Sequence, residues 1–207
     1  MYGSDADEAS AEAPTVGDGV GEPVVEPAVR EAAASTTTAA HARLKGKDRA
    51  ARPDRVSSIL VAVGAGPHTG ATVDVAREIA DATGSWLELF HVVPSDEALV
   101  DGDATPVGDR EDADAAEYAA AGDRLLSSAR DRLGDFDRVD RWLVEDRTAA
   151  GAIVEQSPYY DLVVVGAPTT GAVGRFVFGS TTDTVIDDAE VPVVVVEAQG
   201  DTSLDVA

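Results

Sequence analysis

The chain has 207 residues, which is enough for one domain and some additional material. Its 39 acidic residues against 16 lysines and arginines give a formal net charge of −23. A charge of this size repels nucleic acids and anionic lipid surfaces, so the composition argues against both as partners. The chain contains no cysteine, which excludes disulfides, thiolate metal sites and cysteine nucleophiles.

The composition also bears on where the protein works. The longest apolar runs, such as residues 193–196, are far shorter than the roughly 20 residues of a transmembrane helix. The first residues are acidic, unlike the basic start of a secretory signal. We therefore expect a cytoplasmic protein with no membrane insertion. The excess of acidic residues resembles that of proteins from salt-loving archaea, where concentrated salt screens neighbouring carboxylates.

The N-terminal quarter of the chain differs in composition from the rest. Residues 1–31 contain 8 acids and 1 base, whereas residues 41–55 contain 6 bases and 2 acids. The first 40 residues have almost no large apolar side chains to offset the entropy lost on ordering. We predict a disordered tail over residues 1–54. Its short basic hinge at residues 41–47 is interpreted as a solvated linker, with an acidic partner as the alternative.

Regular patterns begin at Val56 and alternate between strands and helices. Short apolar runs ended by glycine, proline or acidic residues predict strands, and apolar residues three or four apart predict helices. The predicted elements, in chain order, are a strand at 58–64, a helix at 69–83, a strand at 86–93, a helix at 110–133, a strand at 139–144, a helix at 148–156, a strand at 161–166, a helix at 180–188 and a strand at 191–197.

This alternation predicts one α/β domain over residues 55–199, followed by a flexible C-terminus at residues 200–207. The expected architecture is a doubly wound five-stranded parallel sheet flanked by four helices. Counted along the chain, the strands should lie in the order 3-2-1-4-5. Pro192 cannot donate to a strand ladder, so the last strand is expected at an edge. Ligands of such sheets bind beyond the carboxyl ends of the strands, here between the first and fourth strands.

A glycine-rich segment, residues 166–182, joins the fourth strand to the last helix. Its glycines allow backbone to approach a phosphate, and the helix starting at Ser180 offers unpaired N–H groups to an anion. The alternative is a simple helix start, in which Ser180 is the N-cap and Asp183 its capping-box partner.

With these features, the sequence resembles the universal stress protein family. The resemblance rests on residues 59–63, residues 89–93, the closing helix with its Val-Pro-Val strand, and a nucleotide-binding motif. That motif is Gly, two residues, Gly, nine residues, Gly-Ser/Thr, and Gly166, Gly179 and Ser180 match it. The resemblance implies the same fold, ATP as a cofactor and a homodimer formed through the last strand. An exposed valine edge would also invite such pairing.

Two positions depart from the family pattern. Thr169 stands where the motif has its second glycine, and Gly64 stands where ATP-binding members carry an Asp that contacts the nucleoside. The strand ends and the motif together predict a nucleotide site and no catalytic or metal-binding residue. The predicted site residues are Ala62, Val63, Gly64, Val92, Val165, Gly166, Pro168, Thr169, Gly179, Ser180, Thr181 and Thr182.

The first loop, residues 64–72, suggests two further interpretations. It resembles the phosphate loop of flavodoxins, but Pro67 stands where those proteins carry a hydroxyl, which disfavours a flavin. The loop could also share a phosphate with the glycine-rich segment. His68 is interpreted as a ligand contact or a helix-start residue, and His91 as a packing residue rather than a general base.

Three functions are compatible with these residues. The first hypothesis is a non-catalytic regulatory or protective module that binds an adenine nucleotide. The second is a family member that has lost the nucleotide and acts only through protein–protein contacts, which the departures at Gly64 and Thr169 favour. A slow ATPase is the third and weakest hypothesis, because no placed general base supports it.

Overall fold

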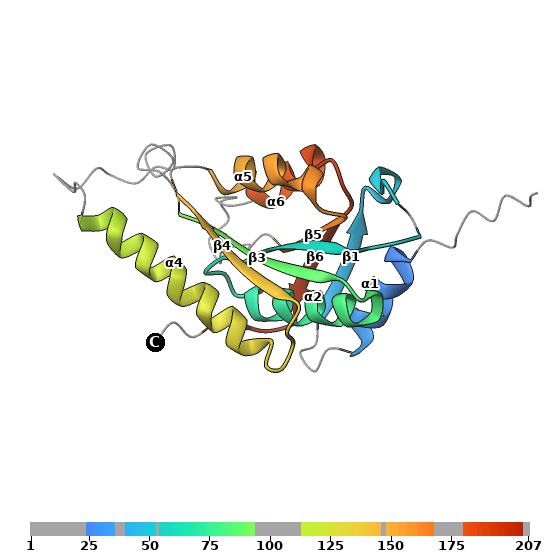
Figure 1. Cartoon of the computed structure of the whole chain (residues 1–207), viewed down its shortest axis with the longest axis horizontal. Coiled ribbons are helices and arrows are strands. Elements are labelled where there is room, and N and C mark those ends of the chain that lie inside the picture. Colours follow the sequence, from blue (N-terminus) through green and yellow to red (C-terminus); the bar gives the residue numbers. More distant parts are fainter. Residues whose placement is uncertain are drawn as a thin grey trace, which may run out of the picture.

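The computed structural model describes residues 24–35, 40–52, 54–93, 113–145, 148–167 and 180–204. These residues form three layers, with a central six-stranded sheet between helices (Figure 1). On one side lie α1 (Val25–Ser35), α2 (Thr69–Thr83) and α4 (Ala113–Arg132). On the other side lie α5 (Ala149–Gln156) and α6 (Ser180–Asp188).

The sheet runs in the order β1-β6-β5-β2-β3-β4, and every neighbouring pair is parallel except β1 with β6. Strands β2 to β6 are the five predicted strands, and their predicted order is confirmed. The bounds of the strands are Ala40–Lys45 (β1), Ser58–Ala62 (β2), Trp86–Val92 (β3), Val139–Val144 (β4), Leu162–Gly166 (β5) and Val193–Ala198 (β6), and short 3₁₀ turns occupy Lys47–Arg49 and Ser157–Tyr159.

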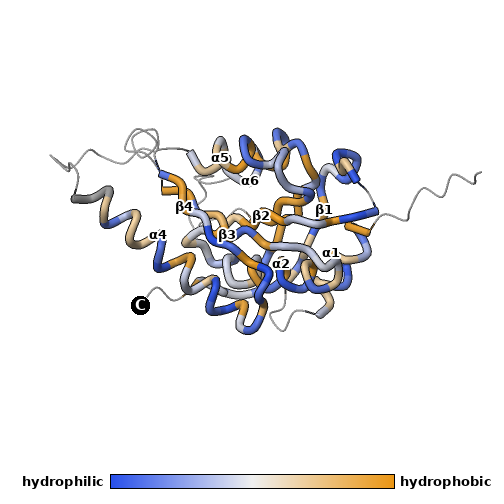
Figure 2. The backbone as a smooth tube through the Cα atoms, viewed as in Figure 1, coloured by the Kyte–Doolittle hydropathy of each residue, from blue (hydrophilic) through white to orange (hydrophobic). Residues whose placement is uncertain are grey.

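The central strands are buried on both faces, as their continuous apolar sequences predict. Ile59 and Val61 of β2 face a core cluster with α1, α2 and α4, whereas Leu60 faces a second cluster with α5 and α6. Each of these three side chains is 0% exposed. Figure 2 shows the hydrophobic segments concentrated in the strands and on the helix sides turned toward them. The sheet is therefore a rigid base from which the loops at its carboxyl edge project.

The structure corrects the prediction of a disordered tail reaching residue 54. Helix α1 buries Val25, Ala28, Val29 and Ala32 in the same core cluster as α2, and β1 pairs along its whole length with β6. The spacing of these four residues is that of one helix face, but the side chains are small and the face is short. Only packing on α2 and pairing with β6 stabilise these elements. Residues 1–23 and 36–39 lie outside the described residues.

The basic hinge is likewise part of the fold in the structure. The guanidinium of Arg49 donates hydrogen bonds to the carbonyl oxygens of Ile186 at 2.7 Å and Ala189 at 2.8 Å. These are carbonyls at the C-terminal end of α6, where a positive charge is favourable. Arg52 pairs with Asp161 at 3.2 Å. Arg49 and Arg52 follow the hinge, and the prediction of a disordered tail is wrong for them. The interpretation of the hinge as a solvated linker is wrong for residues 41–45, which belong to β1.

The expected edge position of the last strand is also wrong. The register from Ala40 opposite Ala198 to Lys45 opposite Val193 places β1 over the whole edge of β6. Pro192 lies just before β6, where its missing N–H group leaves no gap in this ladder. The edge through which a homodimer was expected is therefore occupied by the chain itself.

The C-terminus departs from its predicted flexibility as far as residue 204. Leu204 packs against the core cluster, and Thr202 forms hydrogen bonds with the start of α2. Residues 205–207 lie outside the described residues.

Candidate functional site

A cavity of about 290 Å³ opens at the carboxyl ends of β2, β3 and β5, where the strand order reverses. This is the position at which doubly wound sheets bind ligands. Of the predicted site residues, eight meet on its lining: Ala62, Val63, Gly64, Val92, Val165, Gly166, Thr181 and Thr182. Ser180 is described as the first residue of α6. Pro168, Thr169 and Gly179 lie outside the described residues.

The lining also includes residues that the sequence analysis missed. Ala149 and Ile153 come from the first turns of α5, and Phe90 and Ala167 come from strand ends. A usable signal existed, because α5 follows a parallel strand and its first turn must lie at the carboxyl edge. Thr148 caps this helix through a hydrogen bond from the backbone N–H of Gly151 at 3.2 Å. Four loop residues complete the wall: Gly66, Pro67, His68 and Thr69.

The loop between β2 and α2 is held by its own backbone and by Thr69. The Thr69 hydroxyl donates a hydrogen bond to the Gly64 carbonyl oxygen and accepts one from the Gly66 N–H at 3.3 Å. At Gly64 a Cβ atom would meet nothing within 4 Å. An aspartate side chain at this position would therefore have room in the cavity. Lack of space is not the reason for its absence.

The start of α2 is occupied by the C-terminal segment. The carbonyl oxygen of Thr202 accepts a hydrogen bond from the Gly70 N–H at 2.8 Å, and its hydroxyl accepts one from the Ala71 N–H at 3.1 Å. Thr202 also donates through its N–H and hydroxyl to the Pro67 carbonyl, at 2.7 and 2.8 Å. A Cβ at Gly70 would lie 2.4 Å from the Thr202 carbonyl oxygen, so this contact requires glycine.

Thr202 thereby takes the N–H groups that a phosphate would need at the start of α2. The hypothesis that this loop shares a phosphate with the glycine-rich segment loses its physical basis. A flavin phosphate would need the same amides. The remaining helix start at the cavity is that of α6, where Thr181 and Thr182 lie on the lining.

The two histidines on the lining are held by backbone groups. The Nδ1 of His91 donates to the Val63 carbonyl oxygen at 2.7 Å, which ties the end of β3 to the end of β2. The Nδ1 of His68 accepts a hydrogen bond from the Ala198 N–H at 3.2 Å. The imidazole of His91 also packs on Gly122 of α4, where a Cβ would lie 2.6 Å from the ring. These contacts favour a packing role for His91.

The pKa shifts of the described residues fall outside the cavity lining. Burial and the neighbouring Asp140 raise the pKa of Glu88. Burial and the Glu88 carboxylate raise the pKa of Tyr160 to about 12. The hydrogen bond that Arg132 donates to the Asp74 carboxylate raises the pKa of Arg132, whose Nε also donates to the Gly70 carbonyl oxygen at 3.1 Å. The hydroxyl and N–H of Ser203 lower the pKa of Asp201.

Within the described ranges, no helix is both long enough and apolar enough to cross a membrane. The residues that the structure describes also contain no group of three or more histidine or acidic side chains that could hold a metal ion.

The fold and the position of the cavity define a doubly wound α/β domain with a ligand site at the reversal of strand order. The family model described as "Universal stress protein family" matches residues 56–197. This is more than half of the chain, so the protein belongs to the universal stress protein family. Comparison with curated proteins finds no match.

The chain is similar to solved structures of universal stress proteins, and the first of those below supports the fold. A universal stress protein from Archaeoglobus fulgidus is 20% identical, with a TM-score of 0.51, and the match covers 69% of this chain and 95% of that one. UspA from Lactobacillus plantarum is 23% identical, with a TM-score of 0.47 and coverage of 68% and 97%. A universal stress protein solved in complex with cAMP is 18% identical, with a TM-score of 0.48 and coverage of 68% and 96%.

Proposed function

We propose that this protein is a non-catalytic regulatory or protective module that binds an adenine nucleotide, with ATP as the first candidate. The observation that carries the proposal is the cavity at the carboxyl edge of β2, β3 and β5, closed on one side by the start of α6. That combination offers apolar walls for a base and a helix N-terminus for a phosphate. A related structure holds cAMP.

The residues present fit the nucleoside part of such a ligand. The volume of about 290 Å³ lies near the lower end of small-molecule sites, and the walls include Val63, Ile153 and Val165. Thr182 is 7% exposed and donates its hydroxyl to the Gly166 carbonyl at 3.1 Å, so it joins the start of α6 to the end of β5. The base would lie against Ala62, Val63 and Val92, and the phosphates toward Thr181.

The decisive experiment restores the carboxylate at Gly64. Titrations with ATP, AMP and FMN in multimolar KCl should show that wild type prefers the adenine nucleotides. Gly64→Asp should tighten ATP binding about tenfold or more, since a charge-assisted hydrogen bond is gained. Gly200→Asp is the matched control, because a Cβ there also meets nothing within 4 Å and the residue lies outside the cavity lining.

A second candidate function is a family member that acts through protein contacts alone. The observation that favours it is Gly64, which brings no side chain to the cavity. If neither wild type nor Gly64→Asp binds a nucleotide, the nucleotide proposal fails and this function replaces it. A slow ATPase would be shown by release of phosphate from ATP at a rate above that of a blank.

The homodimer inferred from the last strand needs a different state of the chain. Because β1 occupies the edge of β6, we propose that two copies pair through β6 only when β1 leaves it.

The location is proposed to be the cytoplasm of a salt-adapted cell. That habitat would be supported by a higher melting temperature in multimolar than in dilute KCl, and contradicted by the reverse.

A further inference from the structure

The cavity lacks the charge that a nucleotide polyphosphate needs. Among the described residues on its lining there is no lysine or arginine, and the Nδ1 atoms of His68 and His91 are both bound to backbone. The N–H groups at the start of α2 are taken by Thr202. Among the described residues, a basic side chain that contacts the terminal phosphates therefore has to come from outside this lining.

Strand β1 brings basic side chains toward the carboxyl edge of the parallel strands, where the cavity opens. Because β1 is antiparallel to β6, its first residues lie at the carboxyl end of β6, with His41 opposite Glu197 and Arg43 opposite Val195. Neighbouring strands are about 4.8 Å apart, so β1 lies roughly 10 Å from β5. An arginine side chain and a triphosphate chain together span this distance.

A second groove, of about 240 Å³, runs along this part of the sheet beside α6. Ala167, which directly follows β5, lines both this groove and the cavity, so the two share a wall. The other residues of the groove are His41, Arg43, Lys45, Ile186, Val195 and Glu197. We call it the β1 groove.

The charges in the β1 groove are available to a ligand. Arg43 lies 3.9 Å from Glu197, and their side chains are 70% and 53% exposed, so this ion pair is weak. Glu197 is the acidic residue on the groove wall, and His41 is in contact with Gln199 at 3.2 Å. By contrast, Arg49 is already bound to two carbonyls of α6.

We propose that the β1 groove binds the terminal phosphates of a nucleotide whose nucleoside occupies the cavity, with Arg43 as the principal phosphate ligand, His41 on the side of the cavity and Lys45 at the far end of the groove. This inference rests on the proposed function. It makes the N-terminal segment outside the matched family domain a part of the nucleotide site. It also predicts that affinity grows with the number of phosphates.

The test compares two pairs of substitutions that change the net charge equally. Arg43→Gln with Lys45→Gln neutralises the β1 groove. Arg30→Gln with Lys47→Gln is the matched control, because both residues line another pocket, between α1 and β1, and neither lines the β1 groove. Each full-length variant is titrated with ATP, ADP, AMP and adenosine at the lowest KCl concentration that keeps wild type folded, and circular dichroism verifies the fold.

The groove variant should lose about tenfold or more in affinity for ATP, less for ADP, and little for AMP and adenosine, because each lost charge-assisted contact concerns a terminal phosphate. The control should change ATP binding less than about threefold. Equal losses in both variants, or an unchanged affinity for ATP in the groove variant, would overturn the inference while leaving the proposed function intact. If wild type binds neither ATP nor adenosine, both proposals fail.

Discussion

The parallel strands β2 to β6 and the N-terminal pair α1–β1 belong to one sheet, but they are stabilised in different ways. Strands β2, β3, β5 and β6 bury large side chains on both faces, whereas α1 buries two valines and two alanines on one face. Strand β1 has a sheet neighbour only on the β6 side within the described residues. An element attached to one edge of a sheet can therefore be ordered without an apolar sequence of its own. We expect such a unit to open more easily than the sheet.

The largest effect is expected from a charge in the parallel part. Val194 of β6 is 0% exposed in the core cluster, so Val194→Lys should unfold the whole domain, with a loss above about 4 kcal/mol. The measurement is a thermal or urea melt. Gln199→Lys, which adds the same charge at an exposed position just after β6, should have little effect. A folded Val194→Lys protein would show that β6 is not part of the cooperative core.

A charged side chain on the buried face of α1 should detach only α1 and β1 from the rest of the domain. Ala32 is 1% exposed, whereas Ala34 on the same helix is exposed. In Ala32→Asp, amide hydrogen exchange in residues 40–45 should accelerate at least tenfold while the melt of the parallel sheet persists, because an unpaired carboxylate cannot stay in that contact. Ala34→Asp should behave as wild type.

The same variant tests the dimer. With the β6 edge uncovered, light scattering should show a doubled mass for Ala32→Asp and not for Ala34→Asp. If exchange accelerates without a change in mass, the uncovered edge does not pair and the homodimer proposal fails. If Ala32→Asp instead unfolds the whole domain, the N-terminal pair is as much a part of the cooperative core as β6.

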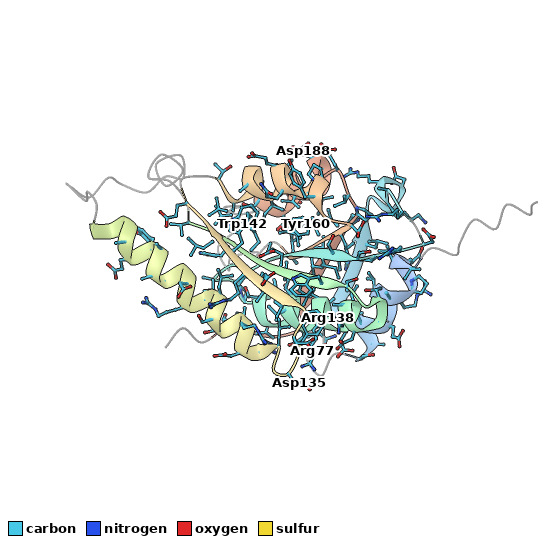
Figure 3. All side chains as sticks on the ribbon, viewed as in Figure 1. Arg77, Asp135, Arg138, Trp142, Tyr160 and Asp188 are labelled. Carbon is cyan, nitrogen blue, oxygen red and sulfur yellow. The ribbon has the colours of Figure 1, made fainter. Side chains whose placement is uncertain are left out.

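The smallest expected effect is a change of stability with pH that arises from Glu88 in the parallel part of the sheet. Glu88 of β3 lies on the α5 side of the sheet near Tyr160, and Figure 3 shows Tyr160 and Trp142 on that side. Trp142 packs edge-on against Phe90, with ring centroids 5.3 Å apart. Burial and Asp140 raise the pKa of Glu88, so the folded state favours its protonated form. Its stabilising contribution is complete below the unfolded pKa and is lost as the pH rises through the raised folded pKa.

Glu88→Gln should therefore be more stable than wild type at neutral pH, by about 0.5 kcal/mol, because solvent screens this half-exposed site. The difference should disappear below the ordinary carboxyl range. Melting temperatures across the pH range measure it. Glu78→Gln on α2 makes the same change of charge elsewhere and should show no such pH dependence. A Glu88→Gln protein that is less stable at neutral pH would contradict the assigned cause.

Much of the fold was predictable because β2, β5 and β6 each contain an uninterrupted apolar run. The apolar run at residues 162–165 indicates both a strand and its central place. The run at residues 193–196 indicates a strand as well, but Pro192 led to the wrong expectation that this strand lies at an edge. The part of the site built from strand ends followed from the same reasoning, since carboxyl ends of parallel strands converge. The wall from α5 was missed although the same reasoning places its first turn at the carboxyl edge, because Ala149 and Ile153 have no distinctive side-chain chemistry of their own.

The sequence by itself determined the family, the order of the parallel strands and the position of the cavity, because these depend on apolar runs and on glycine spacing within single segments. Only the tertiary structure decided three other matters: that β1 covers β6, that Thr202 caps α2, and that Arg43 lines a groove that shares Ala167 with the cavity. Each joins segments more than a hundred residues apart through backbone hydrogen bonds or register. Such contacts need no distinctive side chain, and therefore no local pattern announces them.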